Sequence, residues 1–211
     1  MKKLFALILA ACLLALAACG ATEKAEDTPD PSDAIVGGWT RAGSPELSGE
    51  ALEIFEKAMN DHGSSEYEGV ALLATQVVAG MNYRFLGVKT VDCGTCVTEK
   101  TYCIITVYKD LQGNARVTDI IDTDNYAGFC EDEGCWFKPA SAAMTEELRA
   151  AFDKAADKGL TPVALAGEQA ADGTNYRVIC EDGSSYVFAT LSVDPDGNAK
   201  ITETKPLSPL E

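Results

Sequence analysis

The sequence contains one segment twice, and this repeat limits the possible folds more than any other feature. Residues 76–85 read Gln-Val-Val-Ala-Gly-Met-Asn-Tyr-Arg-Phe, and residues 169–178 read Gln-Ala-Ala-Asp-Gly-Thr-Asn-Tyr-Arg-Val. The match extends upstream, where residues 37–39 pair with residues 134–136, and downstream, where residues 102–117 pair with residues 186–201. Self-similarity of this kind indicates a duplicated structural unit, so the fold must be built from two related halves.

Each copy predicts one helix followed by four strands. Two amphipathic runs place apolar residues at i, i+3, i+4, i+7 and i+8, which is one face of a helix. The apolar positions are Ala51, Ile54, Phe55, Ala58 and Met59 in the first copy, and Leu148, Ala151, Phe152, Ala155 and Ala156 in the second. Turn sequences at residues 111–114 and 195–198 separate β-rich segments and predict hairpins.

The N-terminus predicts export and a lipid anchor. Lys2 and Lys3 precede an apolar run that ends in Leu-Ala-Ala-Cys at residues 16–19, which resembles the lipobox of bacterial lipoproteins. We expect residues 1–18 to be a signal peptide and Cys19 to be diacylated, which anchors the chain without spanning the membrane. An ordinary secretory signal with Cys19 near its cleavage site is the alternative. The expected location is therefore extracytoplasmic, on the cell membrane or on the outer membrane of a Gram-negative cell.

The rest of the chain divides into a tether and two domains. Residues 19–33 are rich in Ala, Thr, Glu, Asp and Pro without periodicity, and predict a flexible tether. The repeat then predicts domains at residues 34–124 and 125–211. A net charge of −16 argues against nucleic acid as a partner. We expect a monomer.

Six cysteines remain after the signal peptide and the lipidated residue are set aside. An even number in an extracytoplasmic chain favours disulfides, whose connectivity the sequence leaves open. The candidates are Cys93, Cys96, Cys103, Cys130, Cys135 and Cys180. A thiol oxidoreductase using Cys93 and Cys96 is an alternative, but the segment after this pair is β-rich and does not offer the helix N-terminus that lowers a thiol pKa. A zinc site from Cys93, Cys96, Cys130 and Cys135 is possible by ligand type.

The first copy contains three motifs in order: Gly-Gly at residues 37–38, Gln-Val-Val-Ala-Gly at residues 76–80, and the segment Val-Tyr-Lys-Asp-Leu-Gln-Gly at residues 107–113. Together they resemble the cystatin superfamily, whose members inhibit papain-like cysteine proteases. The first copy is similar to the stefin-like branch, and the resemblance covers about residues 35 to 122, with a weaker resemblance up to the C-terminus. The resemblance implies an α+β fold with two tandem cystatin-like domains, each an antiparallel β-sheet wrapped around one α-helix.

The resemblance also implies a mechanism. An N-terminal arm and two hairpin loops would lie at one end of the sheet as a wedge, and would plug a protease cleft without offering a bond for cleavage. The residues that match the family's motifs are Val36, Gly37, Gly38, Gln76, Val77, Val78, Ala79, Gly80, Leu111 and Gln112. Gly80 would allow a positive φ and close approach to a partner, and exposed apolar side chains beside it would mark a partner site. Gln76 recurs as Gln169, which favours a structural role for it.

The second copy departs from this pattern at the same place. Its hairpin reads Ala-Ala-Asp-Gly at residues 170–173 and its other loop reads Asp-Pro-Asp-Gly at residues 194–197. A carboxylate that enters a protease cleft loses hydration without an evident partner, so we expect the second copy not to inhibit. The alternative for the whole chain is a non-inhibitory binding or structural lipoprotein. His62 is the single histidine, so neither a Cys-His nor a Ser-His-Asp arrangement can be built around a second imidazole. We expect no enzyme activity, cofactor or resident metal.

Overall fold

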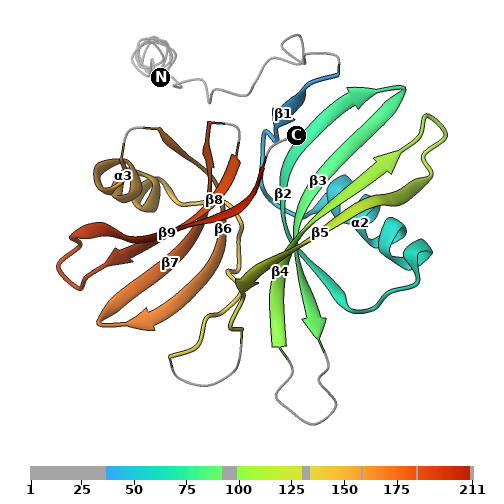
Figure 1. Cartoon of the computed structure of the whole chain (residues 1–211). Helices are drawn as coiled ribbons and strands as arrows, with labels where there is room; N and C mark the ends of the chain where they lie inside the picture. The colour runs from blue at the N-terminus through green and yellow to red at the C-terminus, as the bar shows by residue number, and fades with distance from the viewer. Residues whose placement is uncertain (1–36, 92–98, 130–133, 158, 184, 210–211) are drawn as a thin grey trace, which may run out of the picture. The chain divides into compact units, whose positions relative to one another are not determined.

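The computed structural model describes residues 37–91, 99–129, 134–157, 159–183 and 185–209. The segment from Pro31 to Glu211 forms a compact unit of its own. Its strands form a five-stranded and a four-stranded antiparallel sheet (Figure 1). The predicted signal peptide and tether lie outside the described residues, and the domain boundaries stay predictions.

The first half contains a helix and a sheet in which sequence neighbours are also spatial neighbours. The strands are β1 (Trp39–Arg41), β2 (Tyr67–Val78), β3 (Gly80–Val91), β4 (Glu99–Lys109) and β5 (Ala115–Tyr126). Helix α2 (Gly49–His62) lies between β1 and β2 in the sequence. The helix ends at Gly63, whose left-handed φ of 74° lets its backbone N–H bond the last carbonyls of the helix.

The second half repeats this order, and among its described residues the pairing of β1 is reduced to an isolated bridge between Phe137 and Glu168. Helix α3 (Glu146–Ala155) is followed by β6 (Leu160–Ala171), β7 (Gly173–Asp182), β8 (Ser185–Val193) and β9 (Ala199–Pro209). The Thr145 hydroxyl accepts a hydrogen bond of 3.2 Å from the backbone N–H of Leu148 and so caps α3.

The two halves share irregularities of the backbone as well as their element order. The β2–β3 ladder shifts register after Gly69 and after Leu72, and the β6–β7 ladder shifts after Pro162 and after Leu165. Each pair is related by the offset that also relates Gln76 to Gln169. Bulges at matching positions support the duplication that the sequence repeat predicts, because bulges are kept within related structures.

The predicted fold class was wrong. The chain is mostly antiparallel β-structure, with 56% strand and only two short helices among the described residues, and is not a pair of sheets each wrapped around a helix. The prediction failed mainly because the largest buried cluster joins one face of each sheet and contains no helical residue. Its members are Val70, Ala71, Leu73, Leu86, Val88, Tyr102, Ile104, Ala127, Ala142, Ala164, Ala166, Ile179, Tyr186, Phe188 and Leu207.

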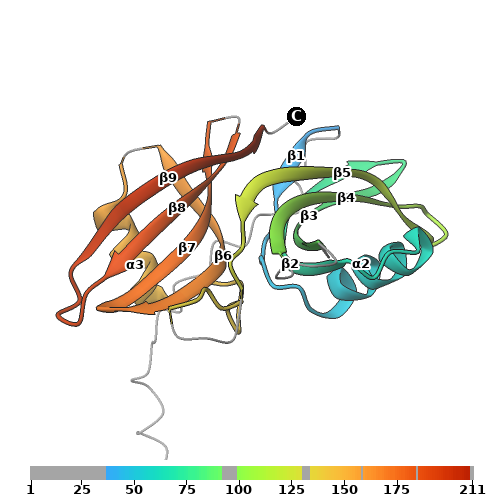
Figure 2. The same ribbon diagram turned by 60° about the horizontal axis from the view of Figure 1, so that its bottom comes forward.

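The helices pack on the opposite faces of the sheets. In β4, Tyr102 and Ile104 join the shared cluster, whereas Cys103 and Ile105 pack toward α2. The same alternation in β8 places Phe188 in the shared cluster. Both faces of these strands are therefore buried, which explains continuous apolar runs where a sheet with one wet face would alternate. Figure 2 shows α2 beside β2 to β5 and α3 beside the second sheet.

Equivalent side chains of the two halves make reciprocal contacts. The guanidinium of Arg84 lies 4.0 Å from the ring centroid of Trp39 and is in hydrogen-bonding contact with Tyr186. In the other half, Arg177 lies 4.1 Å from the ring centroid of Trp136 and contacts Tyr102. Burial raises the pKa of both tyrosines to about 12, although the arginines oppose this effect. Each half thus supplies a cation to an aromatic group of the other.

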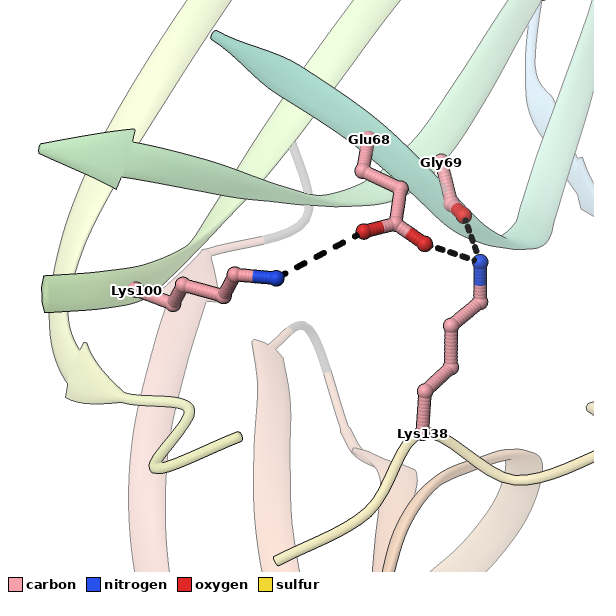
Figure 3. Close-up of polar contacts among 4 residues, drawn as sticks. All are labelled: Glu68, Gly69, Lys100 and Lys138. Atoms are coloured by element: carbon pink, nitrogen blue, oxygen red, sulfur yellow. Dashed lines mark hydrogen bonds and ion pairs between the residues drawn. The ribbon is translucent and has the colours of Figure 1, made fainter. Parts of the chain in front are cut away.

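The segment between the halves is fixed to the first sheet. Lys138 donates hydrogen bonds of 2.7 Å to the Glu68 carboxylate and 2.9 Å to the Gly69 carbonyl, and Lys100 lies 3.9 Å from the same carboxylate (Figure 3). Further along, the Glu46 carboxylate accepts hydrogen bonds from the Ser141 hydroxyl and the Ala143 backbone N–H. The Ser141 bond is the main cause of a lowered pKa at Glu46.

Candidate functional site

Three segments of the first half meet at one end of its sheet. The Gly37 backbone N–H donates a hydrogen bond of 3.1 Å to the Val77 carbonyl, just before Trp39 pairs with Gln76. On the other side, Met81 pairs with Lys109, which precedes the β4–β5 loop. We call this end the first tip, and define it as residues 37–38, 76–80 and 111–112.

Gln76 ties the arm to the hairpin. Its Nε2 donates a hydrogen bond of 2.9 Å to the Gly37 carbonyl, while its Oε1 accepts one of 2.6 Å from Asn82 Nδ2. Both ends of the side-chain amide are therefore used within the molecule, so Gln76 orients the arm.

The hairpin between β2 and β3 is tight, and its backbone lies against β4. Val78 pairs with Gly80, which leaves Ala79 alone at the turn. Gly80 has a φ of +124°, and a Cβ added there would lie 2.4 Å from the Lys109 carbonyl oxygen. The Tyr108 hydroxyl donates a hydrogen bond to the Ala79 carbonyl. Only glycine fits at this position without displacing the backbone.

The β4–β5 loop is organised by one carboxylate. Asp110 Oδ1 accepts hydrogen bonds from the backbone N–H groups of Gln112 at 2.9 Å and Asn114 at 2.8 Å. Asp110 Oδ2 accepts a third bond, of 2.8 Å, from Asn114 Nδ2. The Asn114 side chain contributes most to a lowered pKa at Asp110, because these bonds favour the charged carboxylate. The loop therefore presents Leu111 and Gln112 from a fixed frame.

The apolar side chains of the first tip are in solvent. Leu111 on the β4–β5 loop is 80% exposed and Val78 on the β2–β3 hairpin is 37% exposed, and Ala79, next to Val78 at the turn, is exposed as well. Val77 is half-buried. A monomer gains nothing from a leucine held in water by an ordered loop, so the arrangement suits a partner surface.

The equivalent end of the second half has the same frame. We call it the second tip, and define it as residues 134, 169–173 and 195–196. Gln169 Nε2 donates a hydrogen bond of 2.8 Å to the Gly134 carbonyl and its Oε1 accepts one of 2.9 Å from Asn175. Asp194 accepts bonds from Asp196, from the Asn198 backbone and from the Asn198 side chain, as Asp110 does in the first half.

The two tips differ in the residues that the frame presents. Val77, Val78 and Ala79 are replaced by Ala170, Ala171 and Asp172. Leu111 and Gln112 are replaced by Pro195 and Asp196, both of which are exposed. The first tip therefore offers apolar surface where the second offers two carboxylates.

The structure brings together all the described residues that the sequence singled out for protease binding. Gly37, Gly38, Gln76, Val77, Val78, Ala79, Gly80, Leu111 and Gln112 belong to the first tip, and Val36 lies outside the described residues. Sequence reasoning missed Asp110 and Tyr108. The pattern Asp-x-x-Gly-Asn, which occurs at residues 110–114 and again at residues 194–198, could have revealed Asp110, because an Asp side chain often bonds the backbone of a turn that it begins. No local signal marks Tyr108, whose bond spans 29 residues.

The structure differs from the sequence prediction at two cysteines. Cys103 and Cys180 are free thiols, so their prediction as disulfide partners was wrong. Each is packed in the apolar cluster under the helix of its own half, and burial raises both pKa values to about 12. Cys135 is disulfide-bonded. Cys93, Cys96 and Cys130 lie outside the described residues, so the redox and zinc alternatives that depend on them stay predictions.

No side chains in the described part of the chain form a group of three or more His, Cys, Asp or Glu suited to a metal ion. No helix within the described ranges is long and apolar enough to cross a membrane. No protein-family model and no curated protein matches the sequence.

Proposed function

We propose that the first tip enters the active-site cleft of a papain-like cysteine protease and blocks it. The observation that carries this proposal is the ordered display of Val78 and Leu111, two exposed apolar side chains on loops that the frame places at one end of the sheet. The resemblance of residues 37–38, 76–80 and 107–113 to the cystatin motifs supports a papain-like protease as the partner.

The proposed mode of action is steric and needs no catalytic residue. A protease cleft is concave and largely apolar, and a narrow apolar edge can displace its water. Gly80 keeps the hairpin close to β4, because any larger residue there would meet the Lys109 carbonyl. The tip then places tight turns in the cleft and not an extended peptide. The nucleophile of the protease therefore has no correctly placed peptide bond to attack.

We further propose that Cys19 anchors the inhibitor by lipid outside the cytoplasm, with residues 19–33 as a spacer. The basic and apolar N-terminal run that ends at this cysteine supports the anchor. Metabolic labelling with a radioactive fatty acid would test it, because a Cys19→Ala variant should lose both the label and membrane association.

A titration of papain and a cathepsin-like protease with residues 31–211 tests the inhibitor proposal. Val78→Asp should abolish inhibition, because the new carboxylate would have to enter the cleft without its hydration. Ile121→Asp is a matched control, since Ile121 is 38% exposed on β5 and lies outside the first tip. Equal loss in both variants, or no inhibition by folded wild type, would rule the proposal out.

A non-inhibitory binding role is the second candidate, and the charged second tip favours it. Asp172 and Asp196 occupy a frame that the first half uses to present apolar residues. If wild type binds papain-like enzymes with no loss of their activity, this role replaces inhibition.

A further inference from the structure

The Tyr108 side chain occupies the space directly beneath the first tip. It lies on β4, where it pairs with Asn82 of β3 and with Arg116 of β5. Its hydroxyl donates a hydrogen bond to the carbonyl of Ala79, the residue at the turn of the hairpin. One aromatic side chain thus joins the apex of one loop to the strand that enters the other.

The hairpin backbone rests on the tyrosine ring. A Cβ added at Gly80 would lie 3.0 Å from both Cε2 and the hydroxyl oxygen of Tyr108. Real Cβ atoms show such contacts very rarely, so the absence of a side chain at Gly80 is what permits the ring to sit there. The ring in turn leaves little room for the turn to move toward β4.

The far side of the arrangement is set by β5. The Arg116 guanidinium carbon lies 4.8 Å from the centroid of the Tyr108 ring, within the range of a cation–π contact. Arg116 follows the β4–β5 loop directly, one residue after the start of β5. Tyr108 is therefore held by a residue of the second loop's strand while it holds the first loop.

The second half lacks both members of this pair. Ser192 pairs with Asn175 as Tyr108 pairs with Asn82, and Lys200 pairs with Ser192 as Arg116 pairs with Tyr108. A serine hydroxyl ends one bond beyond Cβ, so it offers neither an aromatic surface to the turn nor a face to a cation. The two frames thus agree at Gln76 and Asp110 but differ at Tyr108 and Arg116.

We propose that Tyr108, held by Arg116, is a positioning residue that fixes the first tip in its binding conformation. This inference rests on the proposed function. A loop that is ordered before binding loses less conformational freedom in the complex, and the gain is expected mainly in slower dissociation. Tyr108 itself stays behind the tip and does not enter the cleft.

The test combines inhibition kinetics with amide hydrogen exchange in residues 31–211. Tyr108→Phe removes only the hydroxyl, and Tyr108→Ser installs the residue of the second half. The loss of one hydrogen bond should make dissociation from papain roughly 3- to 10-fold faster. We expect about that change in Tyr108→Phe and a larger one in Tyr108→Ser, with association rates nearly unchanged. Exchange at residues 78–82 should accelerate in the same order.

Tyr126→Phe is the matched control, because Tyr126 is a 52% exposed tyrosine at the other end of β5. It should change neither readout. Unchanged exchange at residues 78–82 in Tyr108→Ser would overturn the inference, as would dissociation rates that follow only the loss of thermal stability. If wild type does not inhibit papain, the proposed function fails by itself. Exchange then decides alone whether Tyr108 fixes the tip.

Discussion

The two tips are built on one frame and present opposite chemistry. In both, a glutamine amide joins the arm to an asparagine of the hairpin, and an aspartate organises the neighbouring loop. The first frame displays Val78 and Leu111, whereas the second displays Asp172 and Asp196. The comparison separates the shared glutamine and aspartate, which shape the loops of both tips, from the exposed residues that would meet a partner. Among the residues that shape the loops, Tyr108 and Arg116 are replaced by Ser192 and Lys200 in the second half.

The largest expected effect is the loss of inhibition when a carboxylate is placed on the first tip. Leu111→Asp should weaken papain inhibition by about 100-fold, since an unpaired buried carboxylate costs several kcal/mol. Pro195→Asp makes the matching change at the second tip and should leave inhibition as it is. Inhibition constants from progress curves would measure both. Equal effects would show that the tips do not differ in function.

The reverse exchange should transfer part of the activity. We start from the Val78→Asp variant and give its second tip the residues of the first tip. Inhibition should then be roughly 10-fold stronger than in Val78→Asp alone. The changes are Ala170→Val, Ala171→Val, Asp172→Ala, Pro195→Leu and Asp196→Gln. We expect partial recovery because Ser192 and Lys200 do not reproduce the Tyr108 contacts. Full absence of recovery in a folded variant would place specificity outside the two loops.

Loss of the glutamine amide should affect stability alike in the two halves and inhibition in only one. Gln76→Ala and Gln169→Ala each remove two hydrogen bonds of part-exposed groups, which amounts to about 1 kcal/mol of unfolding free energy. Urea denaturation would measure this quantity. Only Gln76→Ala should also weaken inhibition, because only its arm belongs to the first tip. Weaker inhibition in both variants would contradict the division of roles.

The smallest expected effect is a matched response of the two loops to acid. Hydrogen bonds lower the pKa of Asp110 and of Asp194, led in each case by the asparagine four residues later. A lowered folded pKa means that the stabilisation is complete above the unfolded value of about 3.9. It is lost as pH falls through the folded value. Carboxyl chemical shifts should titrate below that of a model aspartate in both loops, and a normal value in either would show that its bonds do not form in solution.

Local pattern was enough to predict the elements, but not how they pack. The apolar positions Ile54, Phe55 and Phe152 lie on helices as expected, and hairpins connect β2 to β3 and β6 to β7. The fold class failed because a sheet wrapped around a helix buries one face, whereas strands such as β4 contribute residues to buried clusters on both faces. The unbroken apolar runs at residues 70–74 and 102–105 were the available sign of two buried faces.

The tip was predictable to the extent that its residues are adjacent in sequence. Residues 76–80 form one motif, and repetition of Gln76 as Gln169 correctly favoured a structural role for both. Tyr108 was not predictable, because its contact with Ala79 depends on the register between β3 and β4. The free thiols of Cys103 and Cys180 were missed for a similar reason, since counting cysteines says nothing about which face of a strand each one occupies.

The reciprocal contacts of Arg84 with Tyr186 and of Arg177 with Tyr102 constrain how the two copies can vary. A substitution at any of these four positions alters a contact between the two copies, so we expect each arginine to vary together with its tyrosine. The exposed residues of the two tips can vary independently of each other. In a duplicated chain of this kind, the exposed tip of one copy can change its binding surface while the tip of the other copy stays the same. Neither copy can be lost, because each supplies part of the buried cluster that both share.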